Sequence, residues 1–491
     1  MCGCARIGEP ADSATADARA LGSAHAGGAA DARAFAAPGG ETGAGPAAAS
    51  ADARAFALEV PAPAAPVAGP KPGDRVFVGL SGGVDSALAA ALLVEQGLDV
   101  TAVYMRNWSR DLPGFRCPWA EELADAERVA VTLGIDLEVW DCEEDYRRTV
   151  VDYLVGEYAR GCTPNPDVMC NQTIKFGTFL DRALARGADW VATGHYARVR
   201  RAGAGADKGA LLATAAEKGA LLATAAGPGA GAGANARASA PEAPAAPAEP
   251  PVELLRAADE HKDQTYFLWR VGQAALGRAL FPVGDVPSKA EVRRMVAARG
   301  LGLEDKPDSD GVCFVGPVGM RSFLLDALER RAGAIVEWET GRVLGTHDGA
   351  FLFTVGQRRG LDLGGGPARY VVATDMGQNL VWVTADRACP GLWCEELELA
   401  DVRWVAGRPP APGRYLVRTR HTGTLRPALL SCGPGQGTDA SPATARVRFD
   451  EPVRTVAPGQ SAVVYDGTRC LGGGIVEKSD APAPPHARDV H

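Results

Sequence analysis

The sequence predicts an α/β fold, a doubly wound and mostly parallel sheet, followed by one or two small all-β modules. Three observations predict it. Apolar runs alternate with helical patterns between residues 75 and 193, and strands of this kind belong to parallel sheets covered on both faces. A loop rich in Gly and Ser separates the first run from the first helix. After Ala334, short β-type runs are separated by Gly, Pro and Asp turns.

The predicted elements follow the chain in order. The apolar run at residues 76–80 predicts the first strand, and residues 87–96 predict a helix that ends at Gly97. The same alternation predicts strands at residues 98–104, 135–140 and 189–193 and a helix at residues 121–133. Later helices are expected at residues 263–270, 288–299 and 320–331, and β-type runs at residues 370–372, 380–383 and 414–418. Ser288 and Glu291 form a capping-box pattern at the start of the second of these helices.

Two stretches have the composition of chain that cannot build a core. Residues 1–70 and 202–250 are rich in Ala, Gly and Pro, and KGALLATAA occurs twice in tandem in the second stretch. We therefore expect a disordered tail at 1–70 and a low-complexity insertion at 202–250 within a domain that spans 71–314. The later boundaries are expected to give a small central domain at 315–388, a β domain at 389–478 and a tail at 479–491.

Composition excludes several classes of protein. A net charge of −9 excludes a protein that coats nucleic acid by charge alone, so any such contact must be a local patch. No run of 18 apolar residues suggests a membrane span, and the N-terminus has no secretory pattern. The 11 cysteines are odd in number and scattered, which favours reduced thiols in a cytoplasmic protein over a disulfide framework.

The loop after the first strand predicts a phosphate site. Its glycines let backbone amides turn toward one point, the helix N-terminus adds positive potential, and two serines can donate hydroxyls. A carboxylate beside phosphate would repel it, and Mg²⁺ bridging from Asp85 would explain its presence. The loop lacks the lysine of GxxxxGK[ST] and the pattern GxGxxG, and a purely structural glycine turn is the alternative. The predicted ATP-binding residues here are Gly79, Leu80, Ser81, Gly82, Gly83, Val84, Asp85 and Ser86.

The loop resembles that of the PP-loop ATP pyrophosphatases, which cleave ATP to AMP and pyrophosphate. Within that superfamily, an ordered set of motifs from about Arg75 to Glu477 is similar to the tRNA-specific 2-thiouridylases. The motifs are VYMRNW at 103–108, TPNPDVMCN at 163–171, ATGHYAR at 192–198, KDQTYFL at 262–268, VCF at 312–314, TVGQRRGL at 354–361, PGQ at 458–460 and CLGGG at 470–474. The resemblance implies a Rossmann-like PP-loop domain, a small central domain and a C-terminal β-barrel.

Two cysteines stand out within these motifs. Cys170 follows a Pro-Asn-Pro-Asp loop and is expected to precede a helix, where Lys175 and the helix N-terminus would lower the pKa of its thiol. On the residues alone, a structural or incidental role is the commoner one for each cysteine. The resemblance implies that Cys313 carries a persulfide received from a cysteine desulfurase or a sulfur-relay protein. Cys170 then releases the sulfur, which leaves a Cys170–Cys313 disulfide, and Asp167 acts as general acid and base.

The resemblance also implies a substrate and further contacts. ATP adenylates O2 of the wobble uridine in tRNAs for Lys, Glu and Gln, AMP leaves, and a monomeric enzyme produces 2-thiouridine. Met105 and Gly194 are expected to contact ATP. The residues expected to contact tRNA are Asn165, Pro166, Asp167, His195, Lys262, Asp263, Gln264, Arg420, His421 and Gln460.

Several alternatives stay open at this point. Cys162, Cys170 and Cys313 could hold an iron–sulfur cluster, although no clustered cysteine spacing supports one. Asp310-Gly311 and His421-Thr422 depart from the usual family pattern, which puts the loop before Cys313 and one RNA contact in doubt. The rival functions are a PP-loop ligase or amidotransferase-type enzyme acting on a small molecule, and a non-catalytic tRNA-binding homologue.

Overall fold

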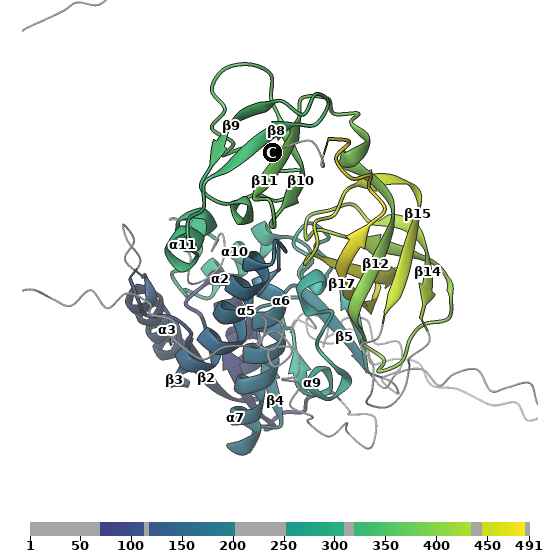
Figure 1. Ribbon diagram of the computed structural model, residues 1–491. Coiled ribbons are helices and arrows are strands. Elements are labelled where there is room, and N and C mark those ends of the chain that lie inside the picture. The colour runs from purple at the N-terminus through teal and green to yellow at the C-terminus, as the bar shows by residue number, and fades with distance from the viewer. Residues whose placement is uncertain (1–68, 112–116, 202–251, 309–318, 434–443, 487–491) are drawn as a thin grey trace, which may run out of the picture. The chain divides into compact units, whose positions relative to one another are not determined.

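The computed structural model describes residues 69–111, 117–201, 252–308, 319–433 and 444–486 (Figure 1). The predicted tail at 1–70 lies almost wholly outside these residues, as does the predicted insertion at 202–250. Within them, no helix is long and apolar enough to cross a membrane.

The first part of the chain is built on a parallel sheet with the strand order β3-β2-β1-β4-β7, which confirms the predicted fold class. Its strands are β1 (Arg75–Gly79), β2 (Asp99–Arg106), β3 (Asp136–Asp141), β4 (Trp190–Ala192) and β7 (Ala279–Leu280). The larger helices are α2 (Val84–Glu95), α3 (Trp119–Leu133), α5 (Asp152–Ala159), α7 (Phe179–Ala185) and α10 (Lys289–Ala298). The shorter ones are α4 (Glu143–Tyr146), α6 (Pro166–Cys170), α8 (Thr265–Leu268) and α9 (Gln273–Arg278), with π-helical turns η1 (Arg147–Val151) and η2 (Asn171–Thr178).

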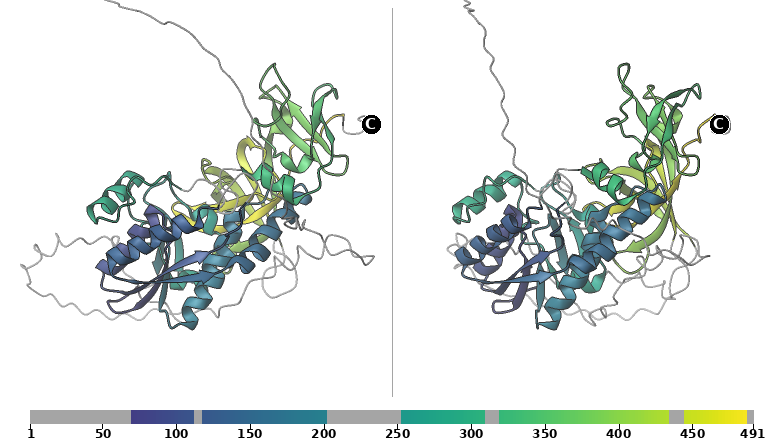
Figure 2. Two further views of the ribbon diagram at one scale, coloured as in Figure 1. Left: turned by 90° about the vertical axis from the view of Figure 1, so that its left-hand side faces the viewer. Right: turned by 60° about the vertical axis from the view of Figure 1, so that its left-hand side comes forward.

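Both faces of this sheet are buried. Successive residues of β1 point to opposite sides, and each side packs in its own apolar cluster. Val76 and Val78 pack with the alanine- and leucine-rich face of α2 in one apolar cluster. Phe77, between them, packs with Trp140 and Phe179 in another. In the turned views the strands lie between two groups of helices (Figure 2).

Several helix boundaries differ from the sequence prediction by a few residues, and two of the differences concern predicted site residues. The helix expected after Cys170 begins earlier, at Pro166, because Pro is favoured at the first helical position and the Asn165 side chain caps the helix by accepting from the Asp167 amide at 3.1 Å. The helix expected at 263–270 is only α8, because the Asp263 carboxylate turns inward and accepts from the amide and hydroxyl of Thr265. The capping box at Ser288 is confirmed on its first half, since the Ser288 hydroxyl accepts from the Glu291 amide at 3.2 Å.

After α11 (Gly319–Ala327), the chain forms a small four-stranded sheet of order β10-β11-β8-β9. Only the β11–β8 pair is parallel. The elements are β8 (Gly333–Glu337), β9 (Val343–His347), η5 (Ala350–Leu352), β10 (Tyr370–Asp375) and β11 (Leu380–Thr384). Apolar side chains of this sheet, of η5 and of α11 share a cluster with Cys170 and α5.

The C-terminal part is a closed antiparallel barrel, as predicted. Its strand order is β12-β15-β14-β13-β16-β17, and a further pairing of β12 with β17 closes it. The strands, which follow the short turn η6 (Pro390–Leu392), are β12 (Trp393–Trp404), β13 (Gly413–Arg418), β14 (Arg426–Cys432), β15 (Ala445–Arg454), β16 (Ser461–Asp466) and β17 (Arg469–Ser479).

The barrel is joined to the first part by a shared sheet. The hairpin of β5 (Ala197–Arg201) and β6 (Val252–Arg256) pairs with the start of β17. Tyr266 and Trp269, in and just after α8, donate to the Ser461 carbonyl and hydroxyl at 3.0 and 3.1 Å. β4 ends at Ala192 and β5 begins at Ala197, so the chain passes within a few residues from the parallel sheet to the sheet that it shares with the barrel.

Candidate active site

The predicted phosphate loop is held open at the carboxyl end of β1. Gly82 has φ +71°, and a Cβ there would lie 2.2 Å from the Glu122 carbonyl oxygen, so only glycine fits. Gly83, at the N-cap of α2, has no side chain with which to cap the helix. The buried Ser86 hydroxyl accepts from the Ser81 amide at 3.2 Å and donates to the Gly83 carbonyl at 3.0 Å. The Ser86 hydroxyl therefore holds the loop and the first turn of α2 together from the buried side, while Ser81 is exposed.

Gly194 and Met105 meet this loop from the neighbouring strands. A Cβ on Gly194 would lie 2.7 Å from the Ser86 amide nitrogen, so the turn after β4 touches the start of α2. A Cβ on Gly79 would lie 3.1 Å from the Met105 methyl, which places Met105 beside the last residue of β1. The resemblance implies that both residues contact ATP, and the structure places both of them beside the loop.

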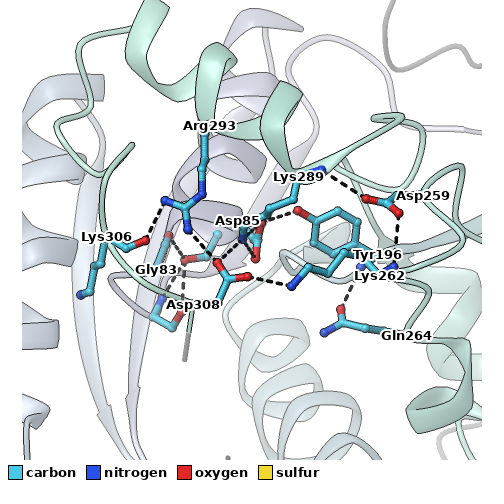
Figure 3. Close-up of polar contacts among 12 residues, drawn as sticks. Gly83, Asp85, Tyr196, Asp259, Lys262, Gln264, Lys289, Arg293, Lys306 and Asp308 are labelled. Atoms are coloured by element: carbon cyan, nitrogen blue, oxygen red, sulfur yellow. Dashed lines mark hydrogen bonds and ion pairs between the residues drawn. The ribbon is translucent and has the colours of Figure 1, made fainter. Parts of the chain in front are cut away.

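Cations surround the loop, although the loop contains none (Figure 3). Lys289, at the start of α10, lies 2.7 Å from the Asp85 carboxylate and 2.9 Å from that of Asp308. Lys262 and Arg293 also reach Asp308, at 2.7 and 3.0 Å. These cations place positive charge beside a loop that lacks the Walker lysine.

Two further contacts tie the same network to the loop. The Lys306 ammonium donates to the Gly82 carbonyl at 2.9 Å and pairs with Asp125. The Tyr196 hydroxyl donates to Asp85 at 2.6 Å, and burial together with the Asp85 charge raises the pKa of Tyr196, so the hydroxyl keeps its proton. Asp85 therefore has protein partners that hold its negative charge in place.

Sequence reasoning assigned no role to Tyr196, Lys289, Arg293 or Asp308. Tyr196 lies within the family motif at 192–198, and a further signal existed for Lys289 and Arg293. Lys289 and Arg293 are four residues apart on a helix with a recognised cap, so they had to share one face. Which element that face meets depends on tertiary structure, because Lys289 and Asp85 are 204 residues apart.

Cys170 lies in the last position of α6 and is buried. It packs in the apolar cluster that includes Tyr146, Met169 and Phe351, and Met105 packs against the same cluster. Cys170 is therefore one turn inside the helix and shielded by apolar side chains. This position differs from the sequence expectation of a thiol just before the helix.

Asp167, Lys175 and His195 form a polar group close to Cys170 along the chain. Burial raises the pKa of Asp167, and the charge of Lys175 opposes that shift. The Lys175 ammonium lies 3.4 Å from His195 Nε2, and His195 Nδ1 lies 2.7 Å from the Thr193 hydroxyl. Burial and the Lys175 charge hold the pKa of His195 well below its usual value. Because ammonium can only donate, Nε2 is the acceptor and the neutral ring carries its proton on Nδ1.

His195 therefore stabilises Lys175 from inside the protein. Its ring is buried and lies about 6 Å from the rings of Phe176 and Phe281. Lys175 belongs to η2, and π-helical turns are often found at functional sites.

Predicted tRNA contacts gather where three parts of the chain meet. The Gln460 side chain donates to the Thr163 carbonyl at 2.6 Å, and the Thr163 amide donates to the Pro458 carbonyl at 2.7 Å. The Thr163 hydroxyl lies 3.1 Å from that of Thr354. Beside these contacts is a hollow of about 300 Å³ lined by Thr354, Val355, Gly356, Gln357, Arg420, Val456, Ala457 and Gln460. Asn165 and Pro166 follow Thr163 directly, at the cap and first position of α6.

The other predicted contacts are divided between exposed and buried positions. Arg420 is exposed, and the His421 ring stacks 4.4 Å from that of Phe267. Gln264 is occupied by Tyr196, whose amide donates to its side-chain oxygen at 2.9 Å. Asp263 is buried and accepts from Arg256 and Arg418 at 3.3 and 2.8 Å, so its carboxylate is used within the protein.

Cys313 and the departure at Asp310-Gly311 lie outside the described residues. Among the described residues, no group of three His, Cys, Asp or Glu side chains could hold a metal ion. Cys162, the third thiol of the cluster alternative, lies against Gly459 of the barrel segment.

Comparison with known proteins covers all three parts of the chain. Residues 74–219 and 232–317 match the model of the tRNA methyl transferase HUP domain, residues 321–385 that of the tRNA methyl transferase PRC-barrel domain, and residues 394–476 that of the aminomethyltransferase beta-barrel domain. A solved NMN synthetase from Francisella tularensis is 18% identical over 30% of this chain and 54% of its own, with a TM-score of 0.17.

Curated relatives are far closer. The tRNA-specific 2-thiouridylase MnmA of Alkalilimnicola ehrlichii is 42% identical over 410 residues, which are 82% of this chain and 97% of the relative. That of Methylibium petroleiphilum is 42% identical over 417 residues, 82% of this chain and 98% of the relative. That of Cupriavidus metallidurans is 39% identical over 411 residues, with 82% and 99% covered. The phosphate loop, the motif around Cys170 and the C-terminal barrel all lie within the matched domains, and the chain belongs to the tRNA-specific 2-thiouridylase family.

Proposed function

We propose that this chain catalyses ATP-dependent 2-thiolation of the wobble uridine of tRNA, with the loop at Ser81–Ser86 as the ATP site and Cys170 as a catalytic thiol. One observation carries the assignment of the site. Met105 lies beside Gly79 at the loop and also packs against the apolar cluster that contains Cys170. The phosphate loop and the thiol thus flank the same strand ends, where ligands bind in open α/β sheets.

ATP would lie with its phosphates at the start of α2. The backbone of Gly82 and Gly83, the exposed Ser81 hydroxyl and the helix N-terminus would bind the pyrophosphate. Met105 and Gly194, at the ends of β2 and β4, would contact the adenosine. Asp85 offers the hard oxygen ligand that Mg²⁺ prefers, and the ion would neutralise phosphate charge when bound there.

The chemistry begins with a poor leaving group. Uracil O2 attacks the α-phosphate of ATP, pyrophosphate leaves, and the adenylated oxygen can then depart as AMP. The terminal sulfur of a persulfide on Cys313 attacks C2 of the base, and AMP is expelled. The Cys170 thiolate then attacks Sγ of Cys313, the S–S bond of the persulfide breaks, and the products are 2-thiouridine and a Cys170–Cys313 disulfide.

Asp167 would move the protons of these steps. Because burial raises the pKa of Asp167, this carboxyl holds a proton more readily than an exposed one, which suits a general acid and base. It lies one helical turn before Cys170, at i and i+3 of the same helix.

Along the sequence, Cys313 stands between two parts of the site. It is five residues after Asp308 of the cation network and six residues before α11, whose Phe323 and Leu324 pack in the cluster that contains Cys170.

tRNA would bind over Asn165, Pro166 and the hollow next to Arg420 and Gln460. Protein side chains read RNA sequence mainly from unstacked bases in loops, and the wobble base must turn into the site for this chemistry. His195 and Asp263 are buried and bonded to Lys175 and Arg418, so they would shape the site without touching tRNA. The enzyme would work as a monomer in the cytoplasm and receive its sulfur from a cysteine desulfurase or a relay protein.

The test uses purified chain, ATP, Mg²⁺, a cysteine desulfurase with cysteine as sulfur source, and two unmodified tRNA transcripts that differ only in U or C at the wobble position. We expect 2-thiouridine and AMP with the U transcript and neither with the C transcript. AMP formation at the same rate with either transcript and without tRNA would favour a ligase acting on a small molecule. Binding of tRNA without AMP formation would favour a non-catalytic homologue.

A further inference from the structure

Three cations share two carboxylates beside the phosphate loop. Lys289 contacts both Asp85 and Asp308, whereas Lys262 and Arg293 contact Asp308 (Figure 3). The group therefore holds one positive charge more than its carboxylates neutralise. The side chains of Lys262, Lys289 and Arg293 are 42%, 14% and 29% exposed, so an anion from solvent can reach them.

Asp308 is the centre of this group. Its two oxygens accept from an ammonium on one side and from an ammonium and a guanidinium on the other. Burial acts to raise the pKa of Asp308, but the hydrogen bonds from Lys262 and Lys289 outweigh it and lower the pKa to about 2. The carboxylate is therefore an anion at any physiological pH.

The group is attached to the loop at two points. Lys289 holds Asp85 in the first turn of α2, and Lys306, two residues before Asp308, donates to the Gly82 carbonyl. Arg293 donates to the carbonyl of Lys306 at 2.8 Å as well as to Asp308, so it can keep the segment in place when Asp308 leaves. Phosphates bound at the start of α2 would meet the same cations.

We propose that Asp308 is an internal competitor for the β- and γ-phosphates of ATP, and that Lys289, Arg293 and Lys262 form the pyrophosphate subsite from which ATP displaces it. The inference rests on the proposed ATP site. Competition makes the two events reciprocal: whatever holds Asp308 on the cations weakens ATP binding, and ATP weakens the hold on Asp308.

The experiment measures the affinity of ATP, pyrophosphate and AMP, each by titration calorimetry with Mg²⁺, for the full chain and for Asp308→Asn. Removal of the competitor should tighten ATP and pyrophosphate about fivefold to tenfold. AMP lacks the two phosphates and should bind as before. Lys289→Met should weaken pyrophosphate and leave AMP unchanged.

Asp401→Asn is the matched control. The Asp401 carboxylate lies 2.8 Å from the Arg270 guanidinium and pairs with none of these three cations. It should leave all three affinities unchanged. Asp308→Ser is the second variant, for use if Asp308→Asn fails to fold. If Asp308 only stabilises the local structure and takes no part in phosphate binding, its replacement would leave ATP and pyrophosphate binding unchanged or weaker. That result would overturn the proposal. No saturable ATP binding by the unmodified chain would instead sink the proposed function.

Discussion

The Tyr196 hydroxyl lies 2.6 Å from the Asp85 carboxylate and joins the segment after β4 to the first turn of α2. Two hydrogen bonds with Gln264 fix Tyr196. The Tyr196 amide donates to the Gln264 side-chain oxygen, and the Gln264 backbone amide donates to the Tyr196 carbonyl. The family motif at 262–268 thus supports the phosphate loop from behind.

Tyr196→Phe should therefore weaken ATP binding without removing any charge. Asp85 would lose one of its two partners, and we expect a several-fold higher KM for ATP and a loss of about 1 kcal/mol in the free energy of unfolding. Tyr415→Phe is the control, because the Tyr415 hydroxyl donates to the Ala411 carbonyl in the barrel region. Equal effects of the two variants on KM would contradict this role.

Gly194→Ala should separate β4 from the phosphate loop. The added Cβ would lie 2.7 Å from the Ser86 amide nitrogen, and overpacking of this kind costs about 1–3 kcal/mol. We expect loss of ATP affinity in calorimetry together with a lower midpoint in urea. Gly156→Ala, where no atom lies within 4 Å of the new Cβ, should leave ATP binding intact.

Lys175→Met should move the pH dependence of thiolation. The Lys175 charge lowers the pKa of Asp167, so its removal lets burial raise that pKa further. The acidic limb of the kcat/KM profile, where Asp167 takes up its proton, should shift to higher pH. Lys478→Met, which removes a surface pair with Glu398, should leave the profile in place. A shift to lower pH in Lys175→Met would be inconsistent with a base at Asp167.

Arg420→Ala should weaken tRNA binding by removing one phosphate contact. Arg420 is exposed and lines the hollow beside Gln460. The slope of log affinity against log salt should fall by about 1, and discrimination between transcripts should not change. Arg186→Ala tests a general charge effect, because the Arg186 carbonyl is bound by Arg75 at the opposite end of β1 from the loop. A loss of the same size in both variants would argue against a local contact.

Local pattern was sufficient to predict the parallel sheet and the glycine- and serine-rich loop after its first strand, whereas Gly194 and Met105 were assigned to ATP through the resemblance to the family. Both depend on short stretches whose geometry the residues nearly dictate, such as the loop with Gly82 and Gly83 between β1 and α2. The start of α6 was also readable from Asn165 and Pro166, but the loop was expected to extend to Cys170.

The cation group could not be predicted in the same way. Lys289 meets Asp85 across 204 residues of chain, and nothing local in either segment indicates the other. The burial of Asp263 likewise depends on Arg418 in the barrel, 155 residues further on. Asp263 was therefore expected to contact tRNA, whereas its carboxylate binds two arginines inside the protein.

Thiolation of an unmodified wobble-uridine transcript by the full chain, beside Cys170→Ser and Cys313→Ser, tests the central claim most directly. The assay supplies ATP, Mg²⁺ and a cysteine desulfurase with cysteine as sulfur source, and nucleoside mass spectrometry detects the product. The account predicts 2-thiouridine from the unmodified chain and none from either variant, with both variants folded and still able to bind ATP. 2-Thiouridine formed at the full rate by both variants would contradict it.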